Sequence, residues 1–360
     1  MIEFKSKEVV STILDPADNF STKKEKIEIR FDPLTGQTGR LAHLGMYRPL
    51  QEDFSAMDTP EIRRHCPFCP PNLEMRGAKY PPELIPQGII TRGQATVIPN
   101  IAPYDKYNPL TVMSHKHLVL MEDLTFSLLK DALSAGIEFC RLVSEKDPDI
   151  PYYHMAWNYM PPSGGSLVHP HQQAIITCHP GNLYSRILEG SRSYHEKYGK
   201  NYWEDLCSTE KKRGERFVSE TGKGVWLVSF VPLGILGEFM VVFPGIKTIL
   251  DLDESGVDDF VRGLQCLFQY FMDMGIYSFN LGLYSAPRNE EEDNFCLHAR
   301  IIPRTFLNLQ QRPPDTNILF MVFHEPYAVI SPEKHCRDLK PFFNQKDSFK
   351  LKTRVADLHD

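Results

Sequence analysis

Residues 166–173, with the sequence SLVHPHQQ, place two imidazoles two positions apart and an amide two positions further on. If this segment is extended, alternate side chains lie on one face, so His169, His171 and Gln173 point into one site. The apolar residues 174–176 that follow favour a strand. One histidine can anchor the segment while the other attacks, and an amide can donate a hydrogen bond to an anionic oxygen. The pattern indicates transfer of a phosphoryl or nucleotidyl group through histidine.

A His-Pro-His triplet also occurs in loops that do no chemistry, and a metal-binding pattern elsewhere in the chain favours the catalytic interpretation. Cys66 and Cys69 have the CxxC spacing of two thiolate ligands of a tetrahedral zinc. His115 or His117 could be the third ligand and His169 the fourth. The alternative is a thioredoxin-like redox pair, which usually opens a helix. The surrounding prolines 67, 70 and 71 favour a tight turn and therefore zinc.

Together these motifs resemble the galactose-1-phosphate uridylyltransferase family of the histidine triad superfamily. The family's active-site run matches Asn158, Ser166, His169, Pro170, His171 and Gln173. Shorter matches are DPLTGQ at residues 32–37, YRP at 47–49 and VIPN at 97–100, the last of which looks like the family's nucleotide-binding strand. The resemblance extends over roughly residues 28–340, almost the whole chain.

The resemblance implies a nucleotidyltransferase that works by a ping-pong mechanism, with His171 as nucleophile and Gln173 and Ser166 on the phosphates. Predicted substrate-binding residues are Arg48, Asn100, Asn158, Gly164, Gly165 and Glu325. Predicted ligands of a closed, structural zinc are Cys66, Cys69, His117 (in place of His115) and His169. The expected substrates are a nucleotide sugar and a sugar 1-phosphate, or phosphate. Hexose-1-phosphate uridylyl transfer, in galactose metabolism, is preferred, and relatives include phosphorylases of ADP-linked sugars. A nucleotide hydrolase is a further alternative, and relatives are usually homodimers with shared sites.

Three departures from the family pattern carry predictions. Gln172 stands where the family usually has glycine, so its side chain must fit or point away. Many members hold a second metal near the end of the chain on a His-x-His pair. Here Arg300 and Tyr284 replace two of the matching histidines and only His298 remains, so we expect no second metal. Glu325 stands in the family's sugar-binding segment, without the usual nearby glutamine.

Composition is that of an ordinary globular protein. The 360 residues are 42% hydrophobic and 24% charged, and the formal net charge of -6 gives no basic surface for nucleic acid. Of the eight cysteines, the six outside the CxxC pair are scattered, which suggests a reducing, cytoplasmic environment. Residues 1–26 are polar without an apolar signal core, and residues 225–246 contain proline, glycines and a glutamate, so we expect no membrane span.

The order of predicted elements repeats. Strands near residues 95–99 and 118–120, a helix over 124–142, a strand over 152–158 and the His171 strand form the first set. Strands at 225–231 and 239–243, a helix over 257–271 and strands at 278–284 and 295–302 form the second, with helices and a flexible turn between the sets. We therefore predict an α+β fold, a duplicated histidine-triad-like module whose antiparallel sheet is faced by helices. The predicted parts are an extension (1–27), a module with zinc and nucleophile (28–200) and a module without them (201–360).

Overall fold

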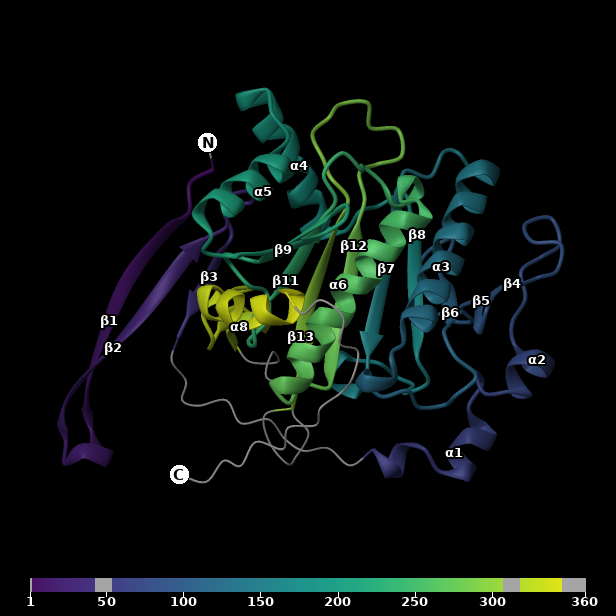
Figure 1. Ribbon diagram of the computed structural model, residues 1–360, viewed down its shortest axis with the longest axis horizontal. Coiled ribbons are helices and arrows are strands. Elements are labelled where there is room, and N and C mark those ends of the chain that lie inside the picture. The colour runs from purple at the N-terminus through teal and green to yellow at the C-terminus, as the bar shows by residue number, and fades with distance from the viewer. Residues whose placement is uncertain (1, 43–53, 307–317, 345–360) are drawn as a thin grey trace.

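The structure, a computed structural model, describes residues 2–42, 54–306 and 318–344. Its centre is a ten-stranded antiparallel sheet in the order β4-β5-β6-β8-β7-β12-β13-β11-β10-β9 (Figure 1). The first half contributes β4 (Ile90–Arg92), β5 (Ala95–Pro99), β6 (Pro109–Val112), β7 (Tyr152–Tyr159) and β8 (His171–Thr177). The second half contributes β9 (Phe217–Thr221), β10 (Gly224–Val228), β11 (Phe239–Val242), β12 (Ser278–Tyr284) and β13 (His298–Arg304).

The strand order is the same in the two halves. It runs 4-5-6-8-7 in the first and 9-10-11-13-12 in the second, and the halves join where β7 pairs with β12. A long helix lies between the third and fourth strands of each half, α3 (Phe126–Lys146) and α6 (Glu254–Asp273). The sequence predicted two strands before the helix and two after it in each half, whereas the structure has three strands before it.

One face of the sheet is packed by α3, α6 and α8 (Pro332–Asn344) (Figure 1). Every second residue of β7 is buried on this side, because successive strand side chains point to opposite faces. The core combines these strand residues with the apolar faces of both helices, among them Phe139, Trp157 and Phe268. These helices thus cover one face of the sheet, and the candidate site lies on the other face.

The opposite face is covered unevenly. Over the second half, α4 (Asn182–Tyr198) and α5 (Tyr202–Arg213) pack Tyr184 and Trp203 onto the strands. Over β5 and β6, the segment that contains α1 (Pro60–His65) and α2 (Asn72–Arg76) adds the two CxxC cysteines and Phe68. Between these covers, the residues of β7, β8 and β12 on this face remain partly exposed. Of the predicted site residues, Asn158, His171 and Gln173 lie on these strands.

The N-terminal segment forms a second, four-stranded sheet in the order β1-β2-β3-β14. Its strands are β1 (Lys5–Asp15), β2 (Ser21–Phe31), β3 (Thr38–Leu41) and β14 (Tyr327–Ala328). Short helices complete the fold: α7 (Ile318–Met321) and the 3₁₀ turns Pro16–Asp18, Ser55–Met57, Met121–Asp123, Pro161–Ser163 and Ile249–Asp251.

The predicted α+β class with an antiparallel sheet is confirmed, and two local predictions are wrong. Residues 118–120 are not a strand; the third strand of the first half is β6, and residues 113–120 form a loop that carries His117 to the cysteines. Residues 217–221, expected within a helical and flexible region, form the edge strand β9.

The predicted division after residue 200 falls between α4 and α5 and remains a prediction. In the described part of the chain, no helix combines the length and apolarity needed to cross a membrane.

Candidate active site and metal centre

Strand β8 sets the direction of the predicted catalytic side chains. His171 opens the strand opposite Val112 of β6, and Gln173 lies between Leu110 of β6 and Ala156 of β7. The alternation of the strand places His171 and Gln173 on one face, as predicted, and this face points away from α3 and α6. Gln172 is buried on the opposite face, so its side chain points away from the site.

The orientation of the His171 ring is fixed by its own chain. Its Nδ1 lies 2.8 Å from the carbonyl oxygen of His169, and because a carbonyl only accepts, Nδ1 carries the proton and donates it. Nε2 therefore keeps its lone pair, and no hydrogen-bond partner for it occurs among the described residues. Burial lowers the pKa of His171, which favours the neutral ring.

His298 occupies the corresponding position at the start of β13, and its ring has different surroundings from that of His171. Its Nδ1 likewise donates to a carbonyl two residues back, that of Cys296, at 3.0 Å. Its ring, however, is stacked between Trp203 and Tyr284, and its Nε2 is fully buried without a partner. Trp203 of α5 thus covers the second-half histidine, whereas His171 is 7% exposed and its ring packs against Phe68.

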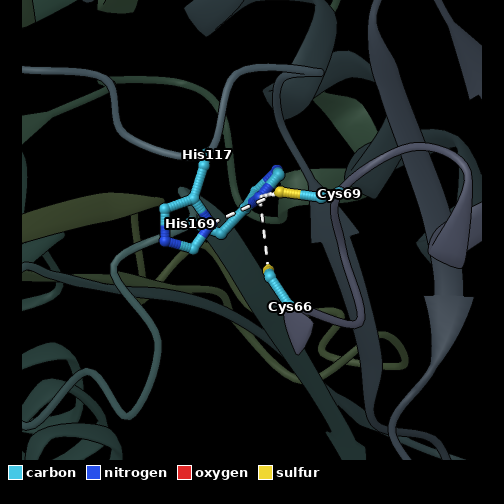
Figure 2. A group of neighbouring side chains, drawn as sticks. All are labelled: Cys66, Cys69, His117 and His169. Carbon is cyan, nitrogen blue, oxygen red and sulfur yellow. Dashed lines mark hydrogen bonds between the residues drawn. The ribbon is translucent and has the colours of Figure 1, made fainter. Parts of the chain in front are cut away.

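Four side chains predicted as metal ligands converge in Figure 2: Cys66, Cys69, His117 and His169. All four are buried, and their ligand atoms lie within 4.8 Å of one another. Sγ of Cys69 lies 3.4 Å from Nδ1 of His117 and 3.5 Å from Nδ1 of His169, and Sγ of Cys66 lies 3.6 Å from the latter nitrogen. His115, the alternative ligand, is exposed and outside the cluster.

These distances fit a tetrahedral metal. With Zn–S near 2.3 Å and Zn–N near 2.0–2.1 Å, neighbouring sulfur and nitrogen ligands are about 3.5–3.6 Å apart. Both histidines turn Nδ1 toward the thiols and donate from Nε2 to backbone carbonyls, His169 to Ser114 at 2.7 Å and His117 to Met57 at 3.2 Å. Such hydrogen bonds are the usual way in which ligating histidines are oriented. Burial also raises the pKa of Cys69 to about 12 and lowers that of His169 to about 4.

Phe68 connects the cluster to His171. This residue lies between the two cysteines in the sequence, and its ring is almost fully buried. The ring centroid is 5.9 Å from that of His169 and 5.2 Å from that of His171. Phe68 was not predicted from the sequence as a site residue, although its position inside the CxxC motif offered a signal. Its ring packs between the cysteine loop and the ring of His171.

A glycine-containing loop after β7 borders the same strip of sheet. Gly164 has a φ of +84°, a conformation that favours glycine, and a side chain on Gly165 would approach the backbone oxygen of Asn158 to 3.1 Å. The loop is held by Asn280 of β12, whose amide donates to Oδ1 of Asn158 at 2.7 Å and to the carbonyl of Ser163 at 2.8 Å. Asn280 was missed by the sequence analysis, because only the pairing of β7 with β12 brings the second half to this loop.

The remaining predicted residues are more dispersed. Ser166 is exposed at the end of the loop, three residues before His169. Asn100 follows β5 and bonds the side chain of Asn108 at 2.9 Å, so it lies on the far side of β6 from His171. Arg48 lies outside the described residues.

Glu325 is found away from His171. Its carboxylate accepts from Thr38 at 2.8 Å and from Arg40 at 3.1 Å, and the residue lines a cavity of about 1140 Å³. That cavity is bordered by β10, α4, α5 and the segments around residues 32–40 and 319–326, and His171 is not among its lining residues. Arg300 also lines it and is paired with the buried carboxylate of Glu238. Within one chain, therefore, Glu325 lines this cavity and His171 does not.

Comparison with known proteins places the fold. The chain matches no protein-family model. It is 26% identical over 352 residues, 96% of this chain and 100% of the relative, to an uncharacterized protein of Archaeoglobus fulgidus.

Among solved structures it is similar to a GalT-like protein and to an ADP-glucose phosphorylase with bound ADP-glucose, both of Arabidopsis thaliana. Each has a TM-score of 0.67 at 17% identity, over 87% of this chain and 98% of the other. A uridylyltransferase structure follows with a TM-score of 0.62 at 20% identity, over the same shares of the two chains. The resemblance first seen in the motifs thus extends to the architecture, and this chain has the fold of the uridylyltransferase and ADP-glucose phosphorylase structures.

Proposed function

We propose that this protein transfers a nucleoside monophosphate from a nucleotide sugar to a sugar 1-phosphate, or to phosphate, through a covalent adduct on Nε2 of His171. The observation that carries the proposal is the fixed tautomer of this ring. Nδ1 donates to the carbonyl of His169, so the lone pair stays on Nε2, which has no partner among the described residues. A neutral imidazole in this state is a nucleophile at neutral pH.

The reaction proceeds in two displacements. In the first, Nε2 of His171 attacks the α-phosphorus of the nucleotide sugar, the bond from that phosphorus to the bridging oxygen breaks, and the sugar 1-phosphate leaves. In the second, an oxygen of the incoming phosphate attacks the same phosphorus and the phosphorus–nitrogen bond breaks, which restores the neutral ring. The covalent intermediate divides one displacement between two repelling phosphates into two easier steps.

The neighbouring groups have separate tasks. Gln173, on the same face as His171 and without a side-chain partner among the described residues, donates its amide to a non-bridging oxygen as charge develops. Ser166 and the backbone amides at Gly164 and Gly165 bind the leaving phosphate, since the small residues permit close approach. Asn158 lies beside them on the adjacent strand β7.

Zinc is the metal proposed for Cys66, Cys69, His117 and His169, because two thiolates and two imidazoles in tetrahedral arrangement suit it. A zinc bound by these four ligands has no open position, so it supplies a cross-link and no activated water. His169 is both a ligand and the acceptor for Nδ1–H of His171, so its backbone is held at the point where the nucleophile is oriented.

For the substrate we prefer a hexose 1-phosphate uridylyl transfer, with adenylyl transfer from an ADP-linked sugar as the alternative. Asn100 and Arg48 are assigned to the nucleotide and Glu325 to the sugar. Because Glu325 and His171 are apart in one chain and the strip of sheet around His171 is partly exposed, the complete site is proposed to form in a cytoplasmic homodimer. Transfer is preferred over hydrolysis, because the third histidine typical of triad hydrolases, an additional acid–base group, is replaced by Gln173.

The proposal is tested by incubating the protein with UDP- and ADP-sugars and with hexose 1-phosphates or phosphate as acceptors. We expect one nucleotide to be exchanged and the double-reciprocal plots for donor and acceptor to be parallel. His171→Asn should abolish exchange, and His115→Asn, a matched change at an exposed neighbouring histidine, should retain it. Intersecting lines, or exchange that survives His171→Asn, contradict the proposal. Consumption of nucleotide sugar without any acceptor identifies a hydrolase instead.

A further inference from the structure

The cavity of about 1140 Å³ lies over the second half of the large sheet, between the strands and the helices α4 and α5. On the sheet side it is bordered by Leu227 of β10, Met240 of β11 and Arg300 of β13, which are paired neighbours across these strands. Most of its other lining side chains are apolar or aromatic. Large cavities with apolar walls and a few polar groups are typical binding sites for small organic ligands.

The position of the cavity corresponds to a part of the first half. The three strand residues have first-half counterparts that are paired in the same order on β5, β6 and β8: Ile98, Leu110 and Gln173. Arg300 is the third residue of β13, as Gln173 is the third residue of β8. Ile98 lies in the segment 97–100, which resembles a nucleotide-binding strand. The cavity therefore occupies the second-half equivalent of the place proposed for the nucleotide.

The main chemical difference is that an arginine replaces the amide of Gln173. Nε of Arg300 donates to the buried carboxylate of Glu238, which fixes the direction of the guanidinium. Its two terminal nitrogens have no hydrogen-bond partner among the described residues, and the side chain is 10% exposed. A guanidinium that is held by one nitrogen and free at the other two is suited to bidentate binding of a phosphate.

A second group of donors lies on the α4 side of the cavity. Arg186 lines the cavity, is exposed and has no ion pair in the described part of the chain. Asn182, the first residue of α4, also lines it, and no side chain caps this end of the helix. The first amide groups of a helix are available to an anion when no side chain caps them. Two arginines and a helix N terminus thus face one cavity.

The carboxylates that line the cavity are already bonded within the chain. Asp32 accepts from the backbone amide of Thr35 at 2.8 Å, and Glu210 accepts from Arg216 at 2.7 Å. Glu325 accepts from Thr38 and Arg40, as described above. The donors of Arg186 and the terminal nitrogens of Arg300 remain available, so an anionic group of a ligand is favoured.

We propose that this cavity binds a nucleoside monophosphate without reacting with it. The phosphate is bound by Arg300 and Arg186, and the base packs on the apolar and aromatic residues of the wall, among them Leu34, Tyr202, Leu206, Leu227, Phe230 and Met240. No transfer occurs, because His298 is enclosed by Trp203 and Tyr284 and is not among the lining residues. The choice of a nucleotide rests on the proposed function, since the first-half counterpart is its proposed nucleotide site.

Equilibrium dialysis of the full-length protein with UMP and with AMP tests the proposal. Neither nucleotide has a leaving group on its phosphorus, so only non-covalent binding is measured. We expect at least one of them to bind at two sites per chain. Arg300→Met with Glu238→Met removes the guanidinium without leaving an unpaired buried charge, and it should weaken one of the two sites at least about 10-fold.

Arg186→Gln is a second variant at an exposed position, where folding is not at risk. It should weaken the same site about 3- to 10-fold, because one charged hydrogen bond to the phosphate is lost. Arg192→Gln is the matched control, since this arginine is exposed on the same helix but does not line the cavity. Uridine and adenosine, which lack the phosphate, should bind the cavity at least about 10-fold more weakly than UMP and AMP.

Binding of both nucleotides that is unchanged in the double variant overturns the proposal. If the double variant does not fold, Arg186→Gln decides, and binding equal to that of Arg192→Gln overturns it. Inorganic phosphate that competes as strongly as the nucleotides also overturns it, because the base then contributes nothing. A single site per chain that the double variant loses would support the cavity and contradict the proposed function, so the two can fail separately.

Discussion

Replacing Asn280 should impair the reaction although this residue belongs to the half without a nucleophile. Its amide holds Oδ1 of Asn158 and the carbonyl of Ser163 at 2.7 and 2.8 Å. Each hydrogen bond contributes about 0.5–1.5 kcal/mol. If the loop must be ordered in the transition state, losing both in Asn280→Ala raises the barrier by about 2 kcal/mol, which is roughly a 30-fold fall in kcat/KM. The assay is steady-state nucleotide exchange, with the rate of formation of the His171 adduct as a second readout.

Two further variants separate hydrogen bonding from packing. Asn280→Asp preserves size but cannot donate, so it should be as impaired as Asn280→Ala. Ile302 of β13 pairs with Asn280 of β12, and its side chain makes no hydrogen bond to the loop. Ile302→Ala should therefore change kcat/KM by less than about 3-fold. The proposed positioning role is refuted if Asn280→Ala retains wild-type kcat/KM, or if Ile302→Ala lowers kcat/KM as much as Asn280→Ala does.

Three other substitutions test separate parts of the structure. Cys69→Ser should lose the metal, measured by elemental analysis, whereas Cys140→Ser, a buried cysteine on α3, should retain one metal per chain. The buried Arg300–Glu238 pair predicts that Arg300→Met lowers the free energy of unfolding by about 3–5 kcal/mol and that adding Glu238→Met restores most of it, measured by denaturant titration. Burial lowers the pKa of His298 to about 3 in the folded protein, whereas in the unfolded chain this ring takes up a proton below about pH 6.5, so the folded state loses stability as pH falls from 6.5 toward 3. Between pH 8 and pH 5, His298 should lower the free energy of unfolding by about 2 kcal/mol. His298→Phe should abolish this pH-dependent loss, and the effect of the substitution on packing is measured separately at pH 8.

Local patterns were sufficient to predict the centre of the candidate site. Alternation along residues 169–173 predicted that His169, His171 and Gln173 share a face. The strand β8 confirms this for His171 and Gln173, whereas His169 precedes the strand and turns its Nδ1 toward the cysteines. The CxxC spacing predicted two thiolate ligands and left His115 or His117 open as the third; the family resemblance selected His117, and Cys66, Cys69, His117 and His169 converge. The shared face of His171 and Gln173 rests on short-range geometry, in which residue spacing determines direction.

Contacts that depend on distant pairing were not predictable in the same way. Nothing in the residues around Asn280 indicates that β12 pairs with β7, so the hydrogen bonds from Asn280 to the loop could be identified only from the sheet order. The polar segment before residue 27 was predicted as an extension, yet it forms β1 and much of β2, because cross-strand pairs between lysines, glutamates and apolar residues do not show in either strand alone. Residues 118–120 are apolar enough for a strand, but the chain there serves to bring His117 to the cysteines.

The mass of the intact, denatured protein after incubation with a nucleotide sugar, without acceptor, tests the central claim most directly. We predict a gain of one nucleoside monophosphate, located by peptide mapping on His171, that disappears when a sugar 1-phosphate or phosphate is added. The size of the gain distinguishes uridylyl from adenylyl transfer. Exchange of nucleotide that proceeds with no adduct, or with an adduct on another residue, would contradict the assignment of His171 as the nucleophile.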